Sequence, residues 1–342
     1  MAESLPVFIV AELSANHNQN FDLAVKTIKA MKEAGVDAVK FQTYTPDTIT
    51  IDCDNEYFQI KEGLWKGKTL YELYQEAYTP WEWQPKLKKI AEDLGLICFS
   101  SAFDKAAVDF LENMNVPAYK VASFEITDIP LIEYIASKGK PIIISTGIAT
   151  LADIEEAVNA CKRMDNEQIA LLKCTSAYPA PIEDANLFTI PNMKETFGTV
   201  VGLSDHTLGS SVTIASVALG AKIIEKHFIL NRNLGGPDAA FSMEPEEFKQ
   251  MAKSIREVEK ALGIVTYELT EKQKKSRMFS RSLFIVKDIK KDEMFTEENV
   301  RSIRPGYGLE PKYIGLIIGK RAKKDLVKSM PVDLSIIYEE GR

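Results

Sequence analysis

The feature that most constrains the fold of this chain is a series of eight short segments rich in Val and Ile, each followed by an amphipathic stretch. The apolar segments lie at residues 7–12, 37–43, 96–101, 118–123, 141–146, 169–175, 199–206 and 222–228. The stretches with helical spacing lie at residues 21–34, 81–94, 104–114, 128–138, 150–163, 185–195, 209–219 and 244–262. Most of the apolar segments lack polar alternation, which is typical of parallel strands covered on both faces. The sequence therefore predicts successive β-α units.

The order of these units predicts an α/β fold, a closed (β/α)8 or TIM barrel, over residues 1–265. A doubly wound open sheet is the alternative. It is disfavoured because no GxGxxG motif follows the first strand, as a dinucleotide-binding sheet would require. In a barrel the carboxyl ends of the strands face the active site. The residues at those ends are therefore the first candidates for chemistry.

The chain changes character after the last amphipathic stretch. Residues 266–282 are basic and weakly patterned, which predicts a linker. Residues 283–342 combine short strands, turns and short helices, which predicts a small α+β domain. A domain of 60 residues is only marginally stable by itself. We therefore expect it to pack against a barrel, either its own or that of a partner subunit.

Composition disfavours several classes of function. The net charge of −7 gives no indication of a nucleic-acid partner. No apolar stretch approaches the about 20 residues that a membrane-spanning helix needs, and the first residues lack the features of a signal peptide. The four cysteines form no CxxC pair, and we expect Cys98 and Cys174 to be reduced core residues. These features predict a cytoplasmic protein with no nucleic-acid or membrane partner.

All three histidines of the chain, His17, His206 and His227, fall at or just after a predicted strand end. His206 and His227 end neighbouring strands, and Glu12 ends the first strand beside them. Imidazole nitrogens on neighbouring strands suit a divalent metal ion. Two histidines completed by water or substrate oxygen favour Mn²⁺ or a similar ion over a closed zinc site. We expect His17 to form a wall of the pocket and not to bind the metal.

Two lysines, Lys40 and Lys120, lie inside apolar strand segments. A buried ammonium group needs an anion, a carboxylate partner or a Schiff base. Together with serine hydroxyls at nearby strand ends, the lysines indicate a pocket for phosphate and carboxylate groups. The alternative is that each lysine pairs with a nearby acid such as Glu12 or Glu125. The serines in question are Ser101, Ser123, Ser145 and Ser204.

Two connections are placed to cover such a pocket. Residues 44–80 separate the second strand from its helix, and so long an insertion at the top of a barrel is typical of an active-site lid. A structural decoration is the alternative. Residues 231–248 follow the last strand, and their GGP sequence predicts a tight turn from which Asp238 projects. We expect this second loop to lie over the metal site.

Distinct motifs mark nearly every predicted strand end. They are AELSANHNQN (11–20), VKFQTY (39–44), YKVASFE (119–125), ISTG (144–147), KCTSAYPAP (173–181), GLSDHTLG (202–209), EKHF (225–228) and GGPDAAFSMEPEEF (235–248). Together they resemble the motifs of the sialic acid synthases. The end of the chain, with RSLFIVKDIKKDE and RPGYGLEP, resembles the antifreeze-like (SAF) domain of that family. The loop GGPDAAFS and the insertion TLYELYQEAYTPWEW are closest to the pseudaminic acid synthases within it.

The resemblance implies a metal-dependent transferase that forms a C–C bond. Phosphoenolpyruvate, the open form of 2,4-diacetamido-2,4,6-trideoxy-L-altropyranose and water would give pseudaminic acid and phosphate, with cleavage of the C–O bond of phosphoenolpyruvate. The implied metal ligands are His206 and His227, holding Mn²⁺, with Mg²⁺ or Co²⁺ as alternatives. The implied catalytic residues are Glu12, Glu125 and His227.

The resemblance also implies how the substrates are held. The residues that would bind phosphoenolpyruvate are Lys40, Ser101, Lys120, Ser123, Ser145, Ser176 and Ser204. The residues that would contact the sugar are Gln42, Tyr178 and Asp238. Arg304 would reach into the barrel of the other subunit to hold an acetamido group, which implies a domain-swapped homodimer.

Three other functions stay open at this point. An N-acetylneuraminate or legionaminate synthase would use N-acetylmannosamine or a related diacetamido sugar in the same reaction. A Schiff-base aldolase would use Lys120 and no metal ion. A sugar-binding protein without catalytic activity is disfavoured by the polar chemistry at every strand end.

Overall fold

The computed structural model describes residues 5–338 of the 342-residue chain. The chain divides into two compact units, residues 1–263 and 264–342. Each unit has a hydrophobic core of its own, so each is described by itself. No helix within residues 5–338 is both long enough and apolar enough to cross a membrane.

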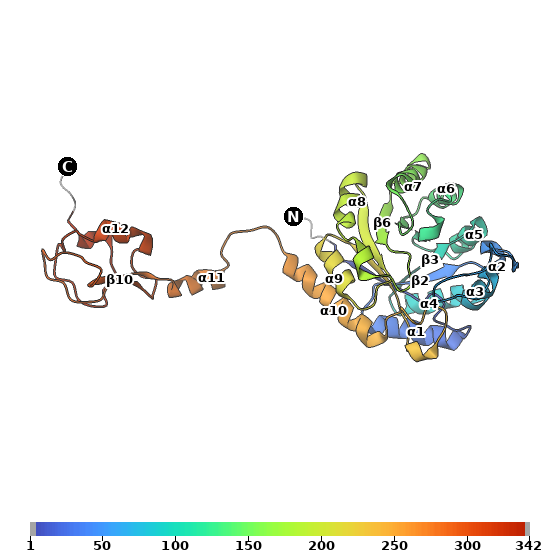
Figure 1. Cartoon of the computed structure of the whole chain (residues 1–342), viewed down its shortest axis with the longest axis horizontal. Helices are drawn as coiled ribbons and strands as arrows, with labels where there is room; N and C mark the ends of the chain where they lie inside the picture. Colours follow the sequence, from blue (N-terminus) through green and yellow to red (C-terminus); the bar gives the residue numbers. More distant parts are fainter. Residues whose placement is uncertain (1–4, 339–342) are drawn as a thin grey trace. The chain divides into compact units, whose positions relative to one another are not determined.

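Eight parallel strands close into a barrel in the first unit, and Figure 1 shows helices arranged around them. The strands are β1 (Phe8–Glu12), β2 (Ala38–Thr43), β3 (Ile97–Ala102), β4 (Tyr119–Val121), β5 (Ile142–Ser145), β6 (Ile169–Cys174), β7 (Val200–Asp205) and β8 (Ile223–His227). β1 pairs with both β2 and β8, so that Glu12 lies between Lys40 on one side and His227 on the other. The predicted (β/α)8 barrel is confirmed, and the open-sheet alternative is wrong.

A helix follows each strand, at the places where the sequence has helical spacing. These helices are α1 (Phe21–Glu33), α4 (Gln84–Asp93), α5 (Lys105–Asn113), α6 (Ile129–Ala136), α7 (Leu151–Arg163), α8 (Thr189–Phe197), α9 (Ser211–Ala218) and α10 (Pro245–Leu262). Asn20, Asp104 and Asp128 fix three of the starts, because each side chain accepts a hydrogen bond from a backbone N–H of the first turn. The apolar faces of the helices contribute to the core that covers the outside of the strands.

Inward-facing side chains fill the barrel in two layers. The lower layer is a small apolar cluster made of Val10, Ala38, Phe99, Ile143, Ala170, Leu172 and Ile223. Side chains that point inward recur at every second residue of a strand. Two residues beyond the apolar cluster the inward positions are polar, as in Glu12, Lys40 and Ser145. The fold therefore places a polar layer at the carboxyl ends of the strands, above an apolar plug.

The insertion of residues 44–80 is a compact excursion between β2 and α4. Its helices are α2 (Pro46–Ile49) and α3 (Leu70–Ala77). A β-bridge between Gln59 and Thr69 closes the part between them. Just beyond the insertion, Trp81 Nε1 donates to the carbonyl oxygen of Tyr44 at 3.1 Å, which ties the two ends of the excursion together.

The second unit is built around two short antiparallel strands, β9 (Ser282–Ile285) and β10 (Val300–Ile303). Its core consists of Leu283, Ile285, Ile289, Phe295, Val300, Ile317, Ala322, Leu326, Val332 and Ile336. The segment expected to be an unpatterned linker contains a short helix, α11 (Glu271–Ser276). Thr270 and Gln273 form a capping box at its start, a local signal that favours a helix even in so polar a stretch.

Candidate active site

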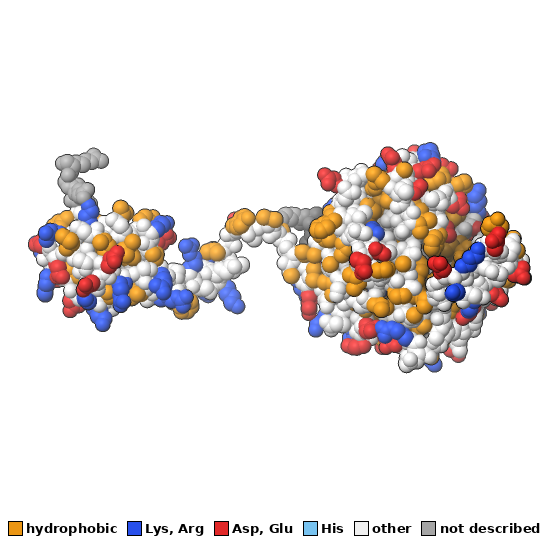
Figure 2. Space-filling view, viewed as in Figure 1, with side chains coloured by type: hydrophobic (Ala, Val, Ile, Leu, Met, Phe, Trp, Pro, Cys, Tyr) orange, Lys and Arg blue, Asp and Glu red, His pale blue; other side chains and the backbone are white. Residues whose placement is uncertain are grey.

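A cavity of about 660 Å³ lies over the polar layer of the barrel. The space-filling view shows a hollow in the region where Figure 1 labels α2, α3 and β3 (Figure 2). Every predicted site residue of the barrel lines the cavity: Glu12, Lys40, Gln42, Ser101, Lys120, Ser123, Glu125, Ser145, Ser176, Tyr178, Ser204, His206, His227 and Asp238. Arg304 belongs to the second unit, directly after β10, and its predicted role stays a prediction.

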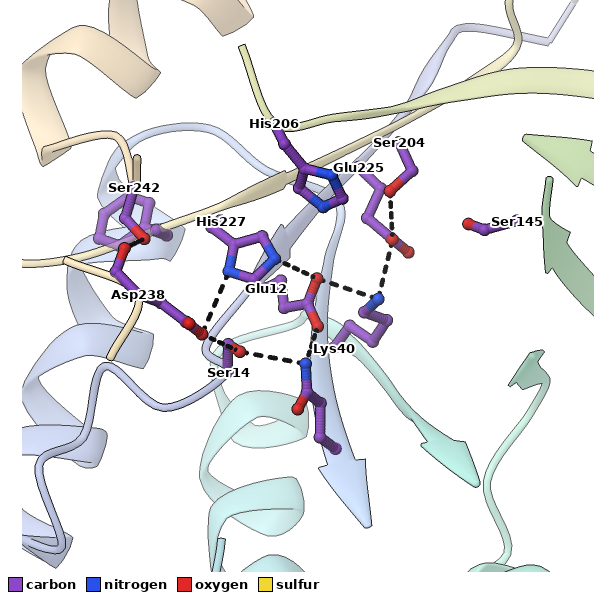
Figure 3. Close-up of polar contacts among 12 residues, drawn as sticks. Glu12, Ser14, Lys40, Ser145, Ser204, His206, Glu225, His227, Asp238 and Ser242 are labelled. Carbon is purple, nitrogen blue, oxygen red and sulfur yellow. Dashed lines mark hydrogen bonds and ion pairs between the residues drawn. The ribbon is translucent and has the colours of Figure 1, made fainter. Parts of the chain in front are cut away.

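A buried network of charges forms the floor of the cavity (Figure 3). Lys40 Nζ lies 3.0 Å from Glu12 Oε2 and 2.8 Å from Glu225 Oε1. Lys120 Nζ donates to Ser145 Oγ at 2.7 Å and lies 3.7 Å from Glu225 Oε1. The four charged side chains are at most 4% exposed. Two ammonium groups and two carboxylates therefore balance each other. Lys40 pairs with Glu12, as the alternative expected, and both lysines share Glu225, which the sequence analysis did not name as a partner.

Serine hydroxyls beside this floor have unused hydrogen-bonding capacity. Ser101 Oγ and Ser176 Oγ are buried without a partner among the described residues. Buried polar atoms without partners are rare, so each is a candidate to bind a ligand. A Cβ on Gly147 would lie 2.1 Å from Ser176 Oγ and 2.7 Å from Ser123 Oγ. Glycine at this position therefore keeps the space in front of the hydroxyls open, as an anion site requires.

The two predicted catalytic carboxylates are in different protonation environments. Burial raises the pKa of Glu12, but Lys40, His227 and a hydrogen bond from Gln42 outweigh burial and lower the pKa to about 2. Burial raises the pKa of Glu125 to about 7, against the opposing charge of Lys120. Glu125 Oε2 is also buried without a partner within the described part of the chain. One carboxylate is thus held ionised, while the other exchanges its proton near neutral pH, as acid–base chemistry requires.

His206 and His227 lie side by side, with ring centroids 5.3 Å apart. His206 Nδ1 lies 3.0 Å from the carbonyl oxygen of Thr175, so it carries a proton and leaves the Nε2 lone pair free. His227 Nδ1 lies 3.6 Å from Asp238 Oδ2, and its Nε2 lies 3.2 Å from Glu12 Oε2. With the proton of His227 on Nδ1, beside Asp238, the lone pair of Nε2 points at the carboxylate of Glu12. The lone pair and the carboxylate repel each other, and a cation between Nε2 and Glu12 would remove that repulsion.

The two histidines therefore offer at most two nitrogen ligands to a divalent cation. No group of three or more His, Cys, Asp and Glu side chains between residues 5 and 338 is arranged as a metal site by itself. This arrangement is compatible with two histidines completed by water or substrate oxygen.

Two loops hold Asp238 over the histidine pair. Ser14 Oγ donates to Asp238 Oδ2. Asn16 Nδ2 donates to the carbonyl oxygen of Phe228 at 3.0 Å and to Ser242 Oγ at 2.8 Å. The loop after β8 is therefore fastened to the loop after β1, and Asp238 is only 8% exposed.

His17 does not line the cavity, so its predicted place in the pocket wall is wrong. The ring is fully buried, with Nε2 3.1 Å from Thr79 Oγ1, and Nδ1 accepts from the backbone N–H of Gln19. Burial lowers the pKa of His17 to about 4. The neutral ring therefore anchors the end of the insertion, as a neighbour of the site and not a member of it.

Glu225 and Cys174 are among the cavity residues that sequence reasoning missed. Glu225 points inward two positions before His227, so the strand alternation was a signal that could have found it. Cys174 was expected in the core, but it is the last residue of β6 and lines the cavity, with Sγ 3.8 Å from His206 Nδ1. Cys98, by contrast, is in the barrel core as predicted.

The insertion covers one side of the cavity. Trp65 Nε1 donates to the carbonyl oxygen of Pro237 at 2.9 Å, next to Asp238. The Trp65 ring also lies 5.6 Å from the ring of Tyr178. The insertion thus bridges to the loop after β8 and to the loop after β6, which agrees with a cover and not with a decoration.

Comparison with known proteins agrees with this geometry. Residues 27–267 match the model of the NeuB family, and residues 280–333 match that of the SAF domain. The chain belongs to the NeuB family. The SAF match covers most of the second unit, so the predicted antifreeze-like domain is confirmed.

Relatives of this NeuB-family chain align over almost its whole length. Pseudaminic acid synthase of Campylobacter jejuni is 49% identical over 94% of this chain and 93% of its own. Pseudaminic acid synthase of Helicobacter pylori is 49% identical over 96% of each chain. Among solved structures, the spore coat polysaccharide biosynthesis protein spsE of Bacillus subtilis has a TM-score of 0.67 and 34% identity, over 99% of this chain and 97% of its own.

A second buried ion pair positions the histidines of this NeuB-family site. Lys226 Nζ lies 2.8 Å from Asp205 Oδ2 and donates to the carbonyl oxygen of Thr207 at 2.6 Å. Asp205 and Lys226 directly precede His206 and His227, so the pair ties the two histidine-bearing strand ends together.

Replacing Lys226 with methionine is expected to lower the free energy of unfolding by about 3–5 kcal/mol, because it leaves Asp205 buried without its cation. Urea unfolding of the full chain measures the change. Lys253→Met, at an exposed lysine of α10 that lies 3.9 Å from Glu257, is the matched control and should change stability by less than about 1 kcal/mol. Equal unfolding midpoints for the two variants would contradict the positioning role.

Proposed function

We propose that this chain condenses phosphoenolpyruvate with 2,4-diacetamido-2,4,6-trideoxy-L-altropyranose and water, giving pseudaminic acid and phosphate. One observation supports this class of reaction. Lysines and serine hydroxyls without hydrogen-bond partners lie at the floor of the same cavity as the histidine pair, directly beside it. The relatives named pseudaminic acid synthase, at 49% identity over nearly the full length, support this sugar over N-acetylmannosamine.

The chain's own groups would act at defined atoms. Lys40, Lys120 and the serines bind the phosphate and carboxylate of phosphoenolpyruvate. Carbon 3 of phosphoenolpyruvate bonds to the aldehyde carbon of the sugar, and the positive charge that develops at carbon 2 faces the ionised Glu12. Glu125, with its pKa near neutrality, takes a proton from the water that adds to carbon 2. The former aldehyde oxygen takes up a proton. Phosphate then leaves with cleavage of the bond between carbon 2 and the bridging oxygen, while the hydroxyl added at carbon 2 gives up its proton and becomes the keto oxygen.

His206 and His227 would hold a divalent metal, Mn²⁺ or alternatively Mg²⁺ or Co²⁺, which when bound supplies Lewis acidity toward the sugar aldehyde. The tautomer set by Thr175 and the place of Asp238 beside His227 support this assignment. Gln42, Tyr178 and Asp238 would contact the sugar from the rim of the cavity.

Two further parts of the proposal concern the assembled protein. Arg304 of one subunit would hold an acetamido group in the barrel of the other, in a domain-swapped homodimer. The protein would act in the cytoplasm, where phosphoenolpyruvate is available. Sedimentation of the full chain as a monomer under assay conditions would contradict the homodimer.

Phosphate release is the test of the reaction. We expect release from phosphoenolpyruvate with the diacetamido trideoxy sugar, at least tenfold less with N-acetylmannosamine, loss on chelation and recovery with Mn²⁺. Full release after metal removal would contradict the metal role. A Schiff-base aldolase would instead be trapped on Lys120 by borohydride with pyruvate, without any metal.

A further inference from the structure

The insertion contributes an apolar wall to a cavity whose floor is charged. Four of its aliphatic side chains line the cavity: Ile49, Ile60, Leu70 and Leu73. The described residues that form the core of the barrel include none of these four. Their apolar surface therefore faces the cavity instead of stabilising the barrel from within.

The wall is held in a defined place by the rest of the insertion. Trp65 bonds to the loop after β8. The backbone N–H of Ile60 donates to the carbonyl oxygen of Lys68 at 2.9 Å, and that of Gly67 donates back to Ile60 at 2.9 Å. Thr69 and Glu72 form a capping box that fixes the start of α3, which carries Leu70 and Leu73. A wall fixed in this way can discriminate between substituents, because it cannot simply move aside.

Such a surface distinguishes a methyl group from a hydroxyl. A hydroxyl placed against aliphatic side chains loses its water partners and gains none, whereas a methyl group gains buried apolar contact. The acetamido groups of the proposed sugar carry amides that need polar partners, such as those at Gln42, Tyr178 and Asp238. Glu62 and Tyr74 of the insertion also line the cavity, so the apolar surface is the part formed by the four aliphatic side chains. The methyl group at carbon 6 is the substituent with no polar atom, so it is the one that suits this aliphatic part.

We propose that this insertion wall, formed by Ile49, Ile60, Leu70 and Leu73, selects sugars that lack a hydroxyl at carbon 6. The inference rests on the proposed function. It adds the residues that distinguish a sugar with a methyl group at carbon 6 from one with a hydroxyl there. The substrate class is a 6-deoxy acetamido sugar. A hexose with a hydroxyl at carbon 6 is excluded by the wall and not by the charged floor.

The experiment measures kcat/KM of the full-length enzyme for two matched sugars, the diacetamido trideoxy sugar and its 6-hydroxy counterpart. We expect the unmodified enzyme to prefer the 6-deoxy sugar by about tenfold or more. Leu73→Asn, which keeps a similar volume, should reduce that preference to less than about threefold, with the KM for phosphoenolpyruvate unchanged. Ile60→Thr is a milder second variant with the same expected direction, should Leu73→Asn fold poorly.

Leu64→Asn is the matched control, because Leu64 lies in the same insertion, is 47% exposed and does not line the cavity. It should leave the preference unchanged. Equal kcat/KM of the unmodified enzyme for both sugars would overturn the inference alone. So would an equal loss for both sugars in Leu73→Asn and Ile60→Thr, since the wall would then only support the fold. Absence of phosphate release with every sugar would overturn the proposed function and this inference together.

Discussion

Replacing Lys40 with methionine is expected to abolish measurable condensation and to lower the free energy of unfolding by about 3–5 kcal/mol. Lys40 lies between Glu12 and Glu225 with only 4% of its side chain exposed. Its loss leaves two buried carboxylates without the cation between them and removes one of the groups proposed to hold phosphoenolpyruvate. Calorimetric titration with phosphoenolpyruvate should show no binding, and urea unfolding should show the loss of stability.

A double variant separates these two effects. Lys40→Met combined with Glu225→Gln removes one positive and one negative charge, so it should recover much of the stability but none of the binding. Lys89→Met, at an exposed lysine of α4 that lies 3.0 Å from Asp93, is the matched surface control and should change stability by less than about 1 kcal/mol. Unchanged binding in Lys40→Met would rule out the role of this lysine as an anion ligand.

Replacing Glu125 with glutamine is expected to lower kcat by about 10²- to 10⁴-fold, because the amide keeps the shape of the side chain but cannot exchange a proton. The KM for phosphoenolpyruvate should change little. In a plot of kcat against pH, the limb that reports the ionisation of Glu125, with a pKa near 7, should disappear in this variant. Glu155→Gln, at an exposed position of α7, is the control. A variant with full kcat would show that Glu125 only shapes the cavity.

The same substitution should stabilise the fold at alkaline pH. Folding raises the pKa of Glu125 from 4.5 to about 7, so ionisation opposes folding above about pH 7. This unfavourable contribution disappears as the pH falls toward 4.5. Glu125→Gln should therefore be more stable than the unmodified chain at pH 8, by up to about 3 kcal/mol, and equally stable near pH 4. Urea unfolding at the two pH values measures the difference.

The barrel and the polar layer of the site could be predicted from the sequence for a simple physical reason. A strand covered on both faces must be apolar, so a lysine within it or a histidine at its end stands out. Lys40, Lys120 and His227 were found in this way, and all three line the cavity. The alternation of side chains along β8 places Glu225 inward, two positions before His227.

Other parts of the site depend on contacts that spacing along the chain does not encode. The place of His17 was predicted wrongly, because its contact with Thr79 joins residues 62 positions apart. The contact of Trp65 with Pro237 spans 172 positions. Whether a residue lines a cavity or supports it from behind depends on such long-range packing. The sequence pattern predicted that the insertion covers the cavity. It did not predict which side chains of the insertion face the cavity.

The hydrogen bond between Trp81 and Tyr44 has an evolutionary consequence. It pins the entry and exit of the insertion to each other, so the stretch between them can change in length and composition without displacing β2 or α4. Doubling the length of a flexible loop with fixed ends raises its closure free energy by only about 0.6 kcal/mol. The insertion can therefore be exchanged as one segment. Descendants of one barrel could acquire new sugar preferences in this way, while the charged residues at the floor of the cavity stay the same.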